Sequence, residues 1–212
     1  MDKKNLIVKV IKTLDKEYGD WRTELNYETN FQLVVAVILS AQCTDARVNM
    51  VTKKLFVKLK SPQDFVDISQ KELEKLIFST GFYRNKALHI KGCAQKVIDN
   101  HEGKVPQTME KLLTLPGIGR KTANVVLGEL FNRSEGVVVD THVMRLAQRI
   151  GMTDQKNPEK IEFDLMKKAK KKDWIPLSNL LIRHGRKYCT ARKPKCLNCP
   201  IEQICLYGGK NK

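Results

Sequence analysis

The stretch LTLPGIGRKTANVV, residues 113–126, decides the fold that we predict, because it joins two helical patterns by a very short turn. The first pattern ends in apolar residues at Leu113, and Ala123 and Val126 give the second pattern an apolar side. Pro116 and the two glycines after it interrupt both patterns and force the chain to reverse. The sequence therefore predicts a hairpin of two helices.

The turn of this hairpin is a candidate phosphate site. Gly117 and Gly119 permit positive φ and carry no side chain over their N–H groups. These donors open the second helix, where the positive end of the helix dipole also favours an anion. We therefore expect Leu115, Gly117 and Gly119 to contact a nucleic-acid backbone without reading its sequence. An ordinary corner between two helices would use the same residues, so the local pattern alone leaves both interpretations open.

The charge of the chain favours the phosphate interpretation. Lys and Arg total 39 against 23 Asp and Glu, a net charge of +16, and such a surplus favours binding to a polyanion. The segment RHGRKYCTARKPK, residues 183–195, contains no acidic residue. A second basic run, KKAKKK at residues 167–172, is interpreted instead as a solvated helix face.

Lys121 stands in the first turn of the second hairpin helix. A cation there opposes the helix dipole, which disfavours the charged form of the side chain. A lysine that loses its proton more readily is a nucleophile able to form a Schiff base. Lysines are numerous in this chain, so position alone raises Lys121 only slightly above an ordinary surface lysine.

Asp140 precedes another apolar helical pattern, in VVVDTHVMRLAQRIG at residues 137–151. It is well placed to cap that helix by accepting from its first N–H groups, and capping alone explains an aspartate here. A carboxylate near a reacting sugar would also stabilise positive charge developing at the anomeric carbon, or help move the proton of the lysine. We interpret His142 as a packed or phosphate-contacting residue rather than a metal ligand or an acid/base group.

The remaining chain is predicted to be helical throughout, so the fold class is all-α. Helical patterns cover 4–17, 31–42, 46–59, 70–78, 86–100, 108–114, 120–131, 141–150, 158–170 and 174–187. Residues 137–140, VVVD, are too few to argue for a sheet. No apolar run approaches the ~20 residues of a membrane span, and no signal peptide is evident, so we expect a cytoplasmic protein without a membrane partner.

Four of the six cysteines form a group with the spacing C-x6-C-x2-C-x5-C, at Cys189, Cys196, Cys199 and Cys205. Without a secretory signal, metal ligation is the leading interpretation. The uneven spacing fits a 4Fe–4S cluster better than the paired C-x2-C motifs of zinc sites, although spacing alone leaves zinc open. We expect a structural centre that holds Arg192 and Lys193 in a fixed shape against DNA. Cys43 and Cys93 are interpreted as buried small side chains.

Together these motifs resemble the endonuclease III family of the helix–hairpin–helix superfamily, which are bifunctional DNA glycosylases and abasic-site lyases. The resemblance runs over nearly the whole chain, from ELNYETNFQLVVAVILSAQCTD at 24–45 to the last cysteine. It implies two helical lobes with the active site in a cleft between them. Residues 22–133 would form a six-helix barrel with the hairpin, and 1–21 with 134–212 a helical domain whose loop at 189–205 carries one 4Fe–4S cluster.

The same resemblance implies roles for individual residues. Lys121 falls on the nucleophile of the family and Asp140 on its essential carboxylate. Gln42 falls on a residue that fills the gap left in the helix, and Phe82 lies in the loop that supplies an apolar wedge between bases. The family often has an aliphatic residue at this second position. Gln42 as a helix-end hydrogen-bonding group and Phe82 as a core aromatic are the structural alternatives.

The resemblance also implies a substrate and a reaction. The partner would be double-stranded DNA with damaged pyrimidines or abasic sites. A monomer associated with the nucleoid would excise the base through a lysine Schiff base and nick the strand 3′ to the abasic site by β-elimination.

Three rival functions use similar features. Adenine glycosylases that act on mispairs usually lack a lysine at position 121 and carry a catalytic glutamate before the glutamine, whereas residues 31–41 contain no acid. They also usually have a further C-terminal domain. A non-enzymatic module with a zinc knuckle would bind DNA without cutting it. A thymine-mismatch glycosylase is harder to exclude from these residues.

Overall fold

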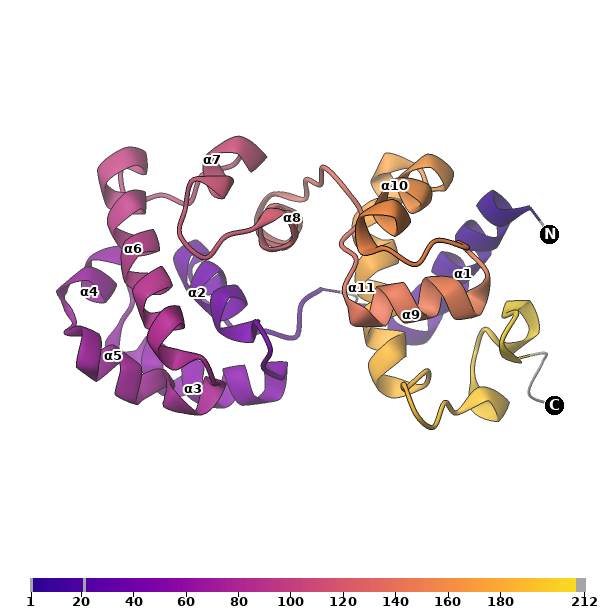
Figure 1. The fold of residues 1–212 in the computed structure, drawn as a ribbon, viewed down its shortest axis with the longest axis horizontal. Helices are drawn as coiled ribbons and strands as arrows, with labels where there is room; N and C mark the ends of the chain where they lie inside the picture. The colour runs from indigo at the N-terminus through magenta and orange to yellow at the C-terminus, as the bar shows by residue number, and fades with distance from the viewer. Residues whose placement is uncertain (1, 21, 209–212) are drawn as a thin grey trace. The chain divides into compact units, whose positions relative to one another are not determined.

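The computed structural model describes residues 2–20 and 22–208, and these residues form helices and loops without a strand (Figure 1). The predicted all-α class is therefore confirmed. The α-helices are α1 Lys3–Tyr18, α2 Asn30–Ser40, α3 Asp45–Lys58, α4 Pro62–Asp67, α5 Gln70–Ile77, α6 Tyr83–His101, α7 Met109–Leu113, α8 Arg120–Phe131, α9 Thr141–Ile150, α10 Pro158–Lys168 and α11 Trp174–Lys187. Short 3-10 helices are η1 Phe78–Thr80, η2 Lys171–Asp173, η3 Cys196–Asn198 and η4 Glu202–Ile204.

The short helix α4 was absent from the predicted set, although its start carries a readable signal. The Ser61 side chain accepts from the backbone N–H of Asp64, and the Asp64 carboxylate accepts from the N–H of Ser61. Pro62 occupies the first turn, where a missing N–H costs nothing. This capping box identifies the helix even though six residues are too few to show an apolar period.

The chain divides into two compact units, which we call the hairpin unit, residues 24–131, and the cysteine unit, residues 1–23 and 132–212. In the hairpin unit α2 packs against α3, α6 and α8, and every residue from Phe31 to Leu39 is buried. This burial on every side makes α2 the central helix of the unit. The barrel arrangement of its neighbours stays a prediction.

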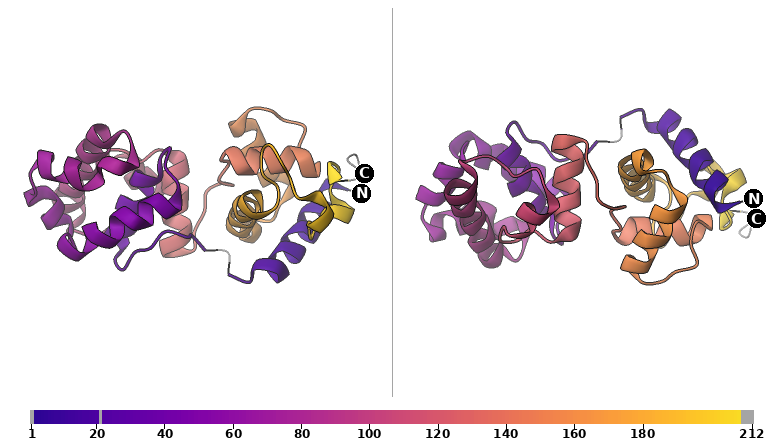
Figure 2. Two further views of the ribbon diagram at one scale, coloured as in Figure 1. Left: turned by 90° about the horizontal axis from the view of Figure 1, so that it is seen from below. Right: turned by 90° about the horizontal axis from the view of Figure 1, so that it is seen from above.

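The cysteine unit brings the first helix of the chain together with the last segments, as the two views of Figure 2 show. Helix α11 packs against both α1 and α9. The core of the cysteine unit is built from fully buried aliphatic side chains such as Ile7, Leu146 and Leu177. None of the described helices combines the length and the apolar character that a membrane crossing requires.

Candidate functional site

The predicted hairpin is present, with α7 and α8 joined by residues 114–119. The turn closes through backbone hydrogen bonds, from the N–H of Leu115 to the carbonyl of Leu112 and from the N–H of Ile118 to the carbonyl of Leu115, both 3.1 Å long. Leu115 and Ile118 are buried. Because the Leu115 side chain faces the core, any contact of this residue with DNA would use its backbone.

Helix α6 packs against the turn. Gly117 has φ of 78°, and a Cβ atom there would lie 2.9 Å from the Cβ of His89. A Cβ on Gly92 would lie 3.2 Å from the ring of Pro116, and the Nζ of Lys96 donates to the Thr114 carbonyl at 2.8 Å. Glycine at 117 is therefore required both by backbone conformation and by the close approach of α6.

The two glycines of the turn differ in their reason for being there. Positive φ is found at Gly117 but not at Gly119, and apart from its two chain neighbours no described residue has an atom within 4 Å of a Cβ built on Gly119. Glycine at 119 thus leaves space rather than permitting an unusual backbone. Neither glycine N–H makes a hydrogen bond within the described residues, and both glycines are exposed.

Lys121 is exposed in the first turn of α8, two residues beyond Gly119. The predicted location of this amine at the start of the second hairpin helix is confirmed. The segment from Gly117 to Lys121 therefore offers backbone donors and a primary amine within five residues.

Asp140 caps α9, as predicted. Its carboxylate accepts from the N–H groups of His142 and Val143, each at 2.8 Å. Figure 1 labels this helix in the cysteine unit. The side chain is half-buried, so one part of the carboxylate is fixed by the cap while the residue keeps access to solvent.

His142 is packed against α11. A Cβ on Gly185 would lie 2.8 Å from its Nδ1, and a guanidinium nitrogen of Arg145 lies 3.1 Å from the same atom. A guanidinium can only donate, so Nδ1 is the acceptor in this contact. Burial lowers the pKa of His142. The packed interpretation is supported, and a phosphate contact stays a prediction.

Gln42 and Phe82 share an unusual backbone conformation. Both are exposed, and both have left-handed φ, 53° at Gln42 and 48° at Phe82. Phe82 is 64% exposed, so its interpretation as a core aromatic is wrong. A bulky residue at positive φ is strained, and such strain persists only where surrounding contacts impose it.

The loop that carries the four cysteines is held by two arginines of α9, which were not among the predicted site residues. Arg149 donates to the carbonyls of Thr190 and Ala191, each at 2.8 Å, and Arg145 donates to the carbonyl of Cys189. Their i,i+4 spacing on an otherwise amphipathic helix was a visible signal, since it puts both on one face. The fixed loop shape expected near Arg192 and Lys193 is supported by these bonds, and both side chains are exposed.

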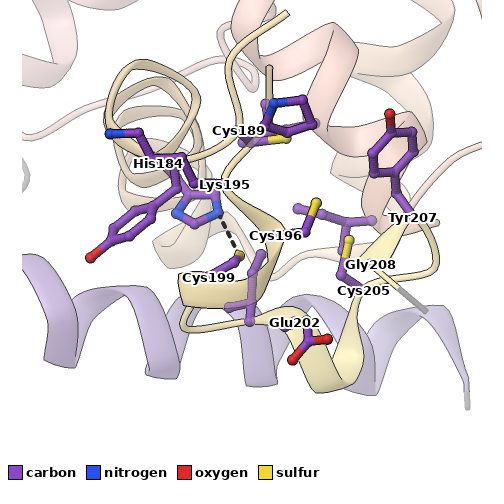
Figure 3. A pocket seen from close by; sticks show the side chains of 14 residues that line it. His184, Cys189, Lys195, Cys196, Cys199, Glu202, Cys205, Tyr207 and Gly208 are labelled. Atoms are coloured by element: carbon purple, nitrogen blue, oxygen red, sulfur yellow. Dashed lines mark hydrogen bonds between the residues drawn. The ribbon is translucent and has the colours of Figure 1, made fainter. Parts of the chain in front are cut away.

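All four cysteines of the group line one pocket (Figure 3). Its other walls include the aliphatic side chains of Leu146, Ile150 and Ile201. Burial raises the pKa of the Cys199 thiol to about 11, and it also raises the pKa of Cys205. Neighbouring cysteines contribute to both shifts, because thiolates placed this close repel one another.

This donor set fits an iron–sulfur cluster. Four cysteine sulfurs supply one ligand for each iron of a 4Fe–4S centre, and the irons would offset the repulsion between thiolates. No group of three His, Cys, Asp or Glu side chains among the described residues is arranged to hold a single metal ion. The sulfurs instead surround a shared space, with Arg149 donating to the sulfur of Cys189 at 3.4 Å.

His184 connects the cysteine pocket to α1. Its Nδ1 lies 2.9 Å from the hydroxyl of Tyr18, and its Nε2 lies 3.3 Å from the sulfur of Cys199. Burial lowers the pKa of His184 to about 4, so the ring is neutral near pH 7. Cys43 and Cys93 lie outside the cysteine group and were both expected to be buried. Cys93 is buried, whereas Cys43 is only half-buried.

Comparison with known proteins gives two matching family models. Residues 35–171 match the HhH-GPD superfamily of base excision DNA repair proteins, and residues 189–205 match the iron–sulfur binding domain of endonuclease III. The second match begins and ends on cysteines of the group.

Individual relatives agree with the family models. An endonuclease III from Synechocystis sp. is 48% identical over 203 residues, covering 96% of this chain and 93% of the relative. The solved structure of a trapped endonuclease III–DNA covalent intermediate is similar with a TM-score of 0.91 at 40% identity, covering 100% of this chain and 99% of the other. A thermostable thymine-DNA glycosylase shares the fold, with a TM-score of 0.79 at 24% identity and coverage of 98% and 97%.

Proposed function

This chain belongs to the endonuclease III family of base excision repair proteins, and from that premise we propose how its residues divide the reaction. The protein is a DNA glycosylase and abasic-site lyase that acts on damaged pyrimidines in duplex DNA and carries a 4Fe–4S cluster. The proposal concerns the residues that bind DNA, attack the sugar and hold the cluster.

Lys121 is the nucleophile. Its neutral amine attacks C1′ of the damaged nucleotide, and the bond between C1′ and the base breaks with the electron pair leaving on the base. The ring then opens to a Schiff base between C1′ and Nζ. Loss of a proton from C2′ and cleavage of the C3′–O3′ bond complete a β-elimination, and water releases the lysine. The exposed position of Lys121 at the start of α8 supports this role, since a nucleophile must reach a sugar outside the protein core.

Asp140 supplies the carboxylate of the reaction. Its negative charge stabilises the positive charge that develops at C1′, and it helps to remove the proton of the attacking amine. The two N–H groups of α9 that it caps hold the carboxylate in one orientation. Capping and catalysis are therefore compatible duties of one side chain.

The hairpin turn and the cysteine loop hold the DNA backbone. The N–H groups of Gly117 and Gly119 donate to a phosphate, with Leu115 fixing the turn by its buried side chain. Arg192 and Lys193 contribute charge from the cysteine loop, and His142 contributes Nε2. Cys189, Cys196, Cys199 and Cys205 hold the cluster that shapes this loop.

Gln42 and Phe82, which we call the probe residues, enter the duplex. Rotating a nucleotide out of the helix costs a few kcal/mol, and less for a damaged base. Gln42 fills the gap that this leaves, and Phe82 inserts its exposed ring between bases.

The protein acts as a monomer in the cytoplasm, associated with the nucleoid.

The proposal depends on an exposed lysine, Lys121, that follows Gly119 by two residues at the start of α8, with both turn glycines exposed as well. The test is covalent trapping: wild-type protein is incubated with a duplex containing an oxidised pyrimidine or an abasic site, and borohydride then reduces the Schiff base. Lys121→Gln should abolish both the adduct and strand cleavage while DNA binding remains. Lys54→Ala, an exposed lysine of the same unit, is the matched control and should trap normally. Unchanged adduct yield in Lys121→Gln would refute the assignment.

Asp140→Asn separates the two duties of Asp140. Asparagine is also a good N-cap, so the stability of α9 should change little, whereas the rate of adduct formation should fall by about 10²–10⁴-fold. Thermal unfolding and single-turnover trapping measure the two effects. An equal rate in both proteins would leave Asp140 with the capping duty alone.

A further inference from the structure

Lys86 is a buried ammonium on α6 of the hairpin unit. The residue is 4% exposed, and its Nζ donates to the carbonyls of Leu39 and Thr80, each at 2.8 Å. Burying a charge is costly unless hydrogen bonds compensate it, and burial lowers the pKa of Lys86. A leucine or methionine would fill the same space without that cost. The position of the two acceptors gives a reason for a lysine.

Both acceptor carbonyls lie just before a probe residue. Leu39 is in the last turn of α2, which leads to Gln42, and Thr80 ends η1, which leads to Phe82. Carbonyls at helix ends lack partners within the helix, so a donor is needed there. One ammonium thus satisfies the ends of two segments that are distant in the sequence.

The two turns that follow are both strained. Gln42 and Phe82 are non-glycine residues with positive φ, and each is exposed. Their own side chains therefore contribute little packing that could impose this backbone. Short-range hydrogen bonds hold each of these segments to its own helix end, whereas the buried bonds of Lys86 join the two segments to each other on the N-terminal side of both turns.

We propose that Lys86 is a positioning residue that sets the Gln42 turn and the Phe82 turn relative to each other, so that both probe residues meet the duplex in one step. The inference rests on the proposed roles of Gln42 and Phe82. Filling the gap and wedging the bases must coincide, because an extruded nucleotide returns to the stack if either is missing. A shared buried donor makes the two turns move together.

The same helix offers a matched control. Lys91 donates from Nζ to the carbonyls of Val66 at 2.6 Å, of Phe65 at 3.2 Å, and of Ile68. These carbonyls end α4, a segment for which no DNA contact is proposed. Lys86→Met and Lys91→Met therefore remove the same group from the same helix, but only the first releases the probe residues.

The experiment compares both variants with wild-type protein, loaded with its cluster. A duplex with 2-aminopurine beside an abasic site reports base extrusion by fluorescence, and borohydride trapping under single-turnover conditions reports the rate. We expect Lys86→Met to lose about 10- to 100-fold in trapping rate at saturating DNA, with a matching loss of the fluorescence change. Lys91→Met should keep both, even if its thermal stability falls as much. Equal rates in the two variants would overturn the proposal.

A second comparison guards against a folding defect in Lys86→Met. Lys86→Arg keeps the charge and the donors but changes their reach. The decrease in trapping rate that it causes is measured twice, once with Gln42 and Phe82 in place and once in a Gln42→Ala/Phe82→Ala background. The penalty should shrink in that background, since coupled residues are not additive. An equal penalty in both backgrounds would overturn the positioning role. Absence of any adduct with wild-type protein would instead contradict the proposed function itself.

Discussion

The hairpin turn and the cysteine loop are both proposed to hold DNA, yet they are stabilised in different ways. The turn at 114–119 is fixed by buried side chains of Leu115 and Ile118 and by glycine where α6 comes close. The loop at 189–205 packs few buried residues, and its shape depends on arginine bonds from α9 and on the four cysteines that we propose as cluster ligands.

The hairpin turn and the cysteine loop therefore depend on different properties of their residues. In the hairpin the requirement is steric, because a Cβ at one glycine collides with a neighbouring helix. In the cysteine loop the proposed requirement is chemical, because four cysteine ligands would draw together a segment that has little core of its own. A larger side chain should therefore destabilise the hairpin turn, and removal of iron should destabilise the cysteine loop.

The largest expected effect is the loss of the cluster. Cys199→Ser should lose iron, release the loop at 189–205 and abolish stable DNA binding, because binding of the centre is coupled to folding of the loop. Hydrogen exchange should rise across the loop while residues 109–131 stay protected. Iron content and exchange followed by mass spectrometry measure both.

Cys43→Ser is the control for this prediction, since Cys43 lies outside the cysteine group and is half-buried. It should retain iron. Exchange that rises equally in the hairpin and in the loop of Cys199→Ser would remove the contrast between the two regions.

The next effect is the replacement of the strained glycine. Gly117→Ala should destabilise the protein by about 1–3 kcal/mol, because alanine must adopt positive φ and its Cβ would meet His89. Gly119→Ala has ordinary φ and open space, so its stability should stay within about 1 kcal/mol of wild type. Urea unfolding of the cluster-loaded proteins compares them, and equal losses would show that the turn is not sterically limited.

The smallest effect concerns charge on the cysteine loop. Arg192→Ala combined with Lys193→Ala should make DNA binding less dependent on salt. The slope of the logarithm of the DNA association constant against the logarithm of the salt concentration should decrease in magnitude by roughly 0.9 for each phosphate that the variant no longer neutralises. The base-excision reaction of bound DNA should be unaffected. Lys171→Ala with Lys172→Ala, on the run interpreted as a solvated face, should leave the slope unchanged, and a similar decrease in both double variants would assign DNA binding to that run instead.

Local patterns predicted the elements well where an apolar stripe or a cap marks them, as for α2, the hairpin and the Asp140 cap. They missed α4, whose capping box was readable but whose length hides any period. The spacing of Arg145 and Arg149 put both on one helix face, but the partners of Arg149, and the bond from Lys86 to Leu39, lie more than 40 residues away in the sequence and no local pattern identifies them. Burial of Leu115 and exposure of Phe82 likewise follow from tertiary packing.

We propose that the amine of Lys121 bonds covalently to deoxyribose, and peptide mapping of the adduct locates that bond. The borohydride-reduced adduct is treated with nuclease and protease, and mass spectrometry locates the residue that carries the sugar remnant. We expect the remnant on Lys121 alone. A remnant on another lysine or on the N-terminal amine, with Lys121 unmodified, would contradict it.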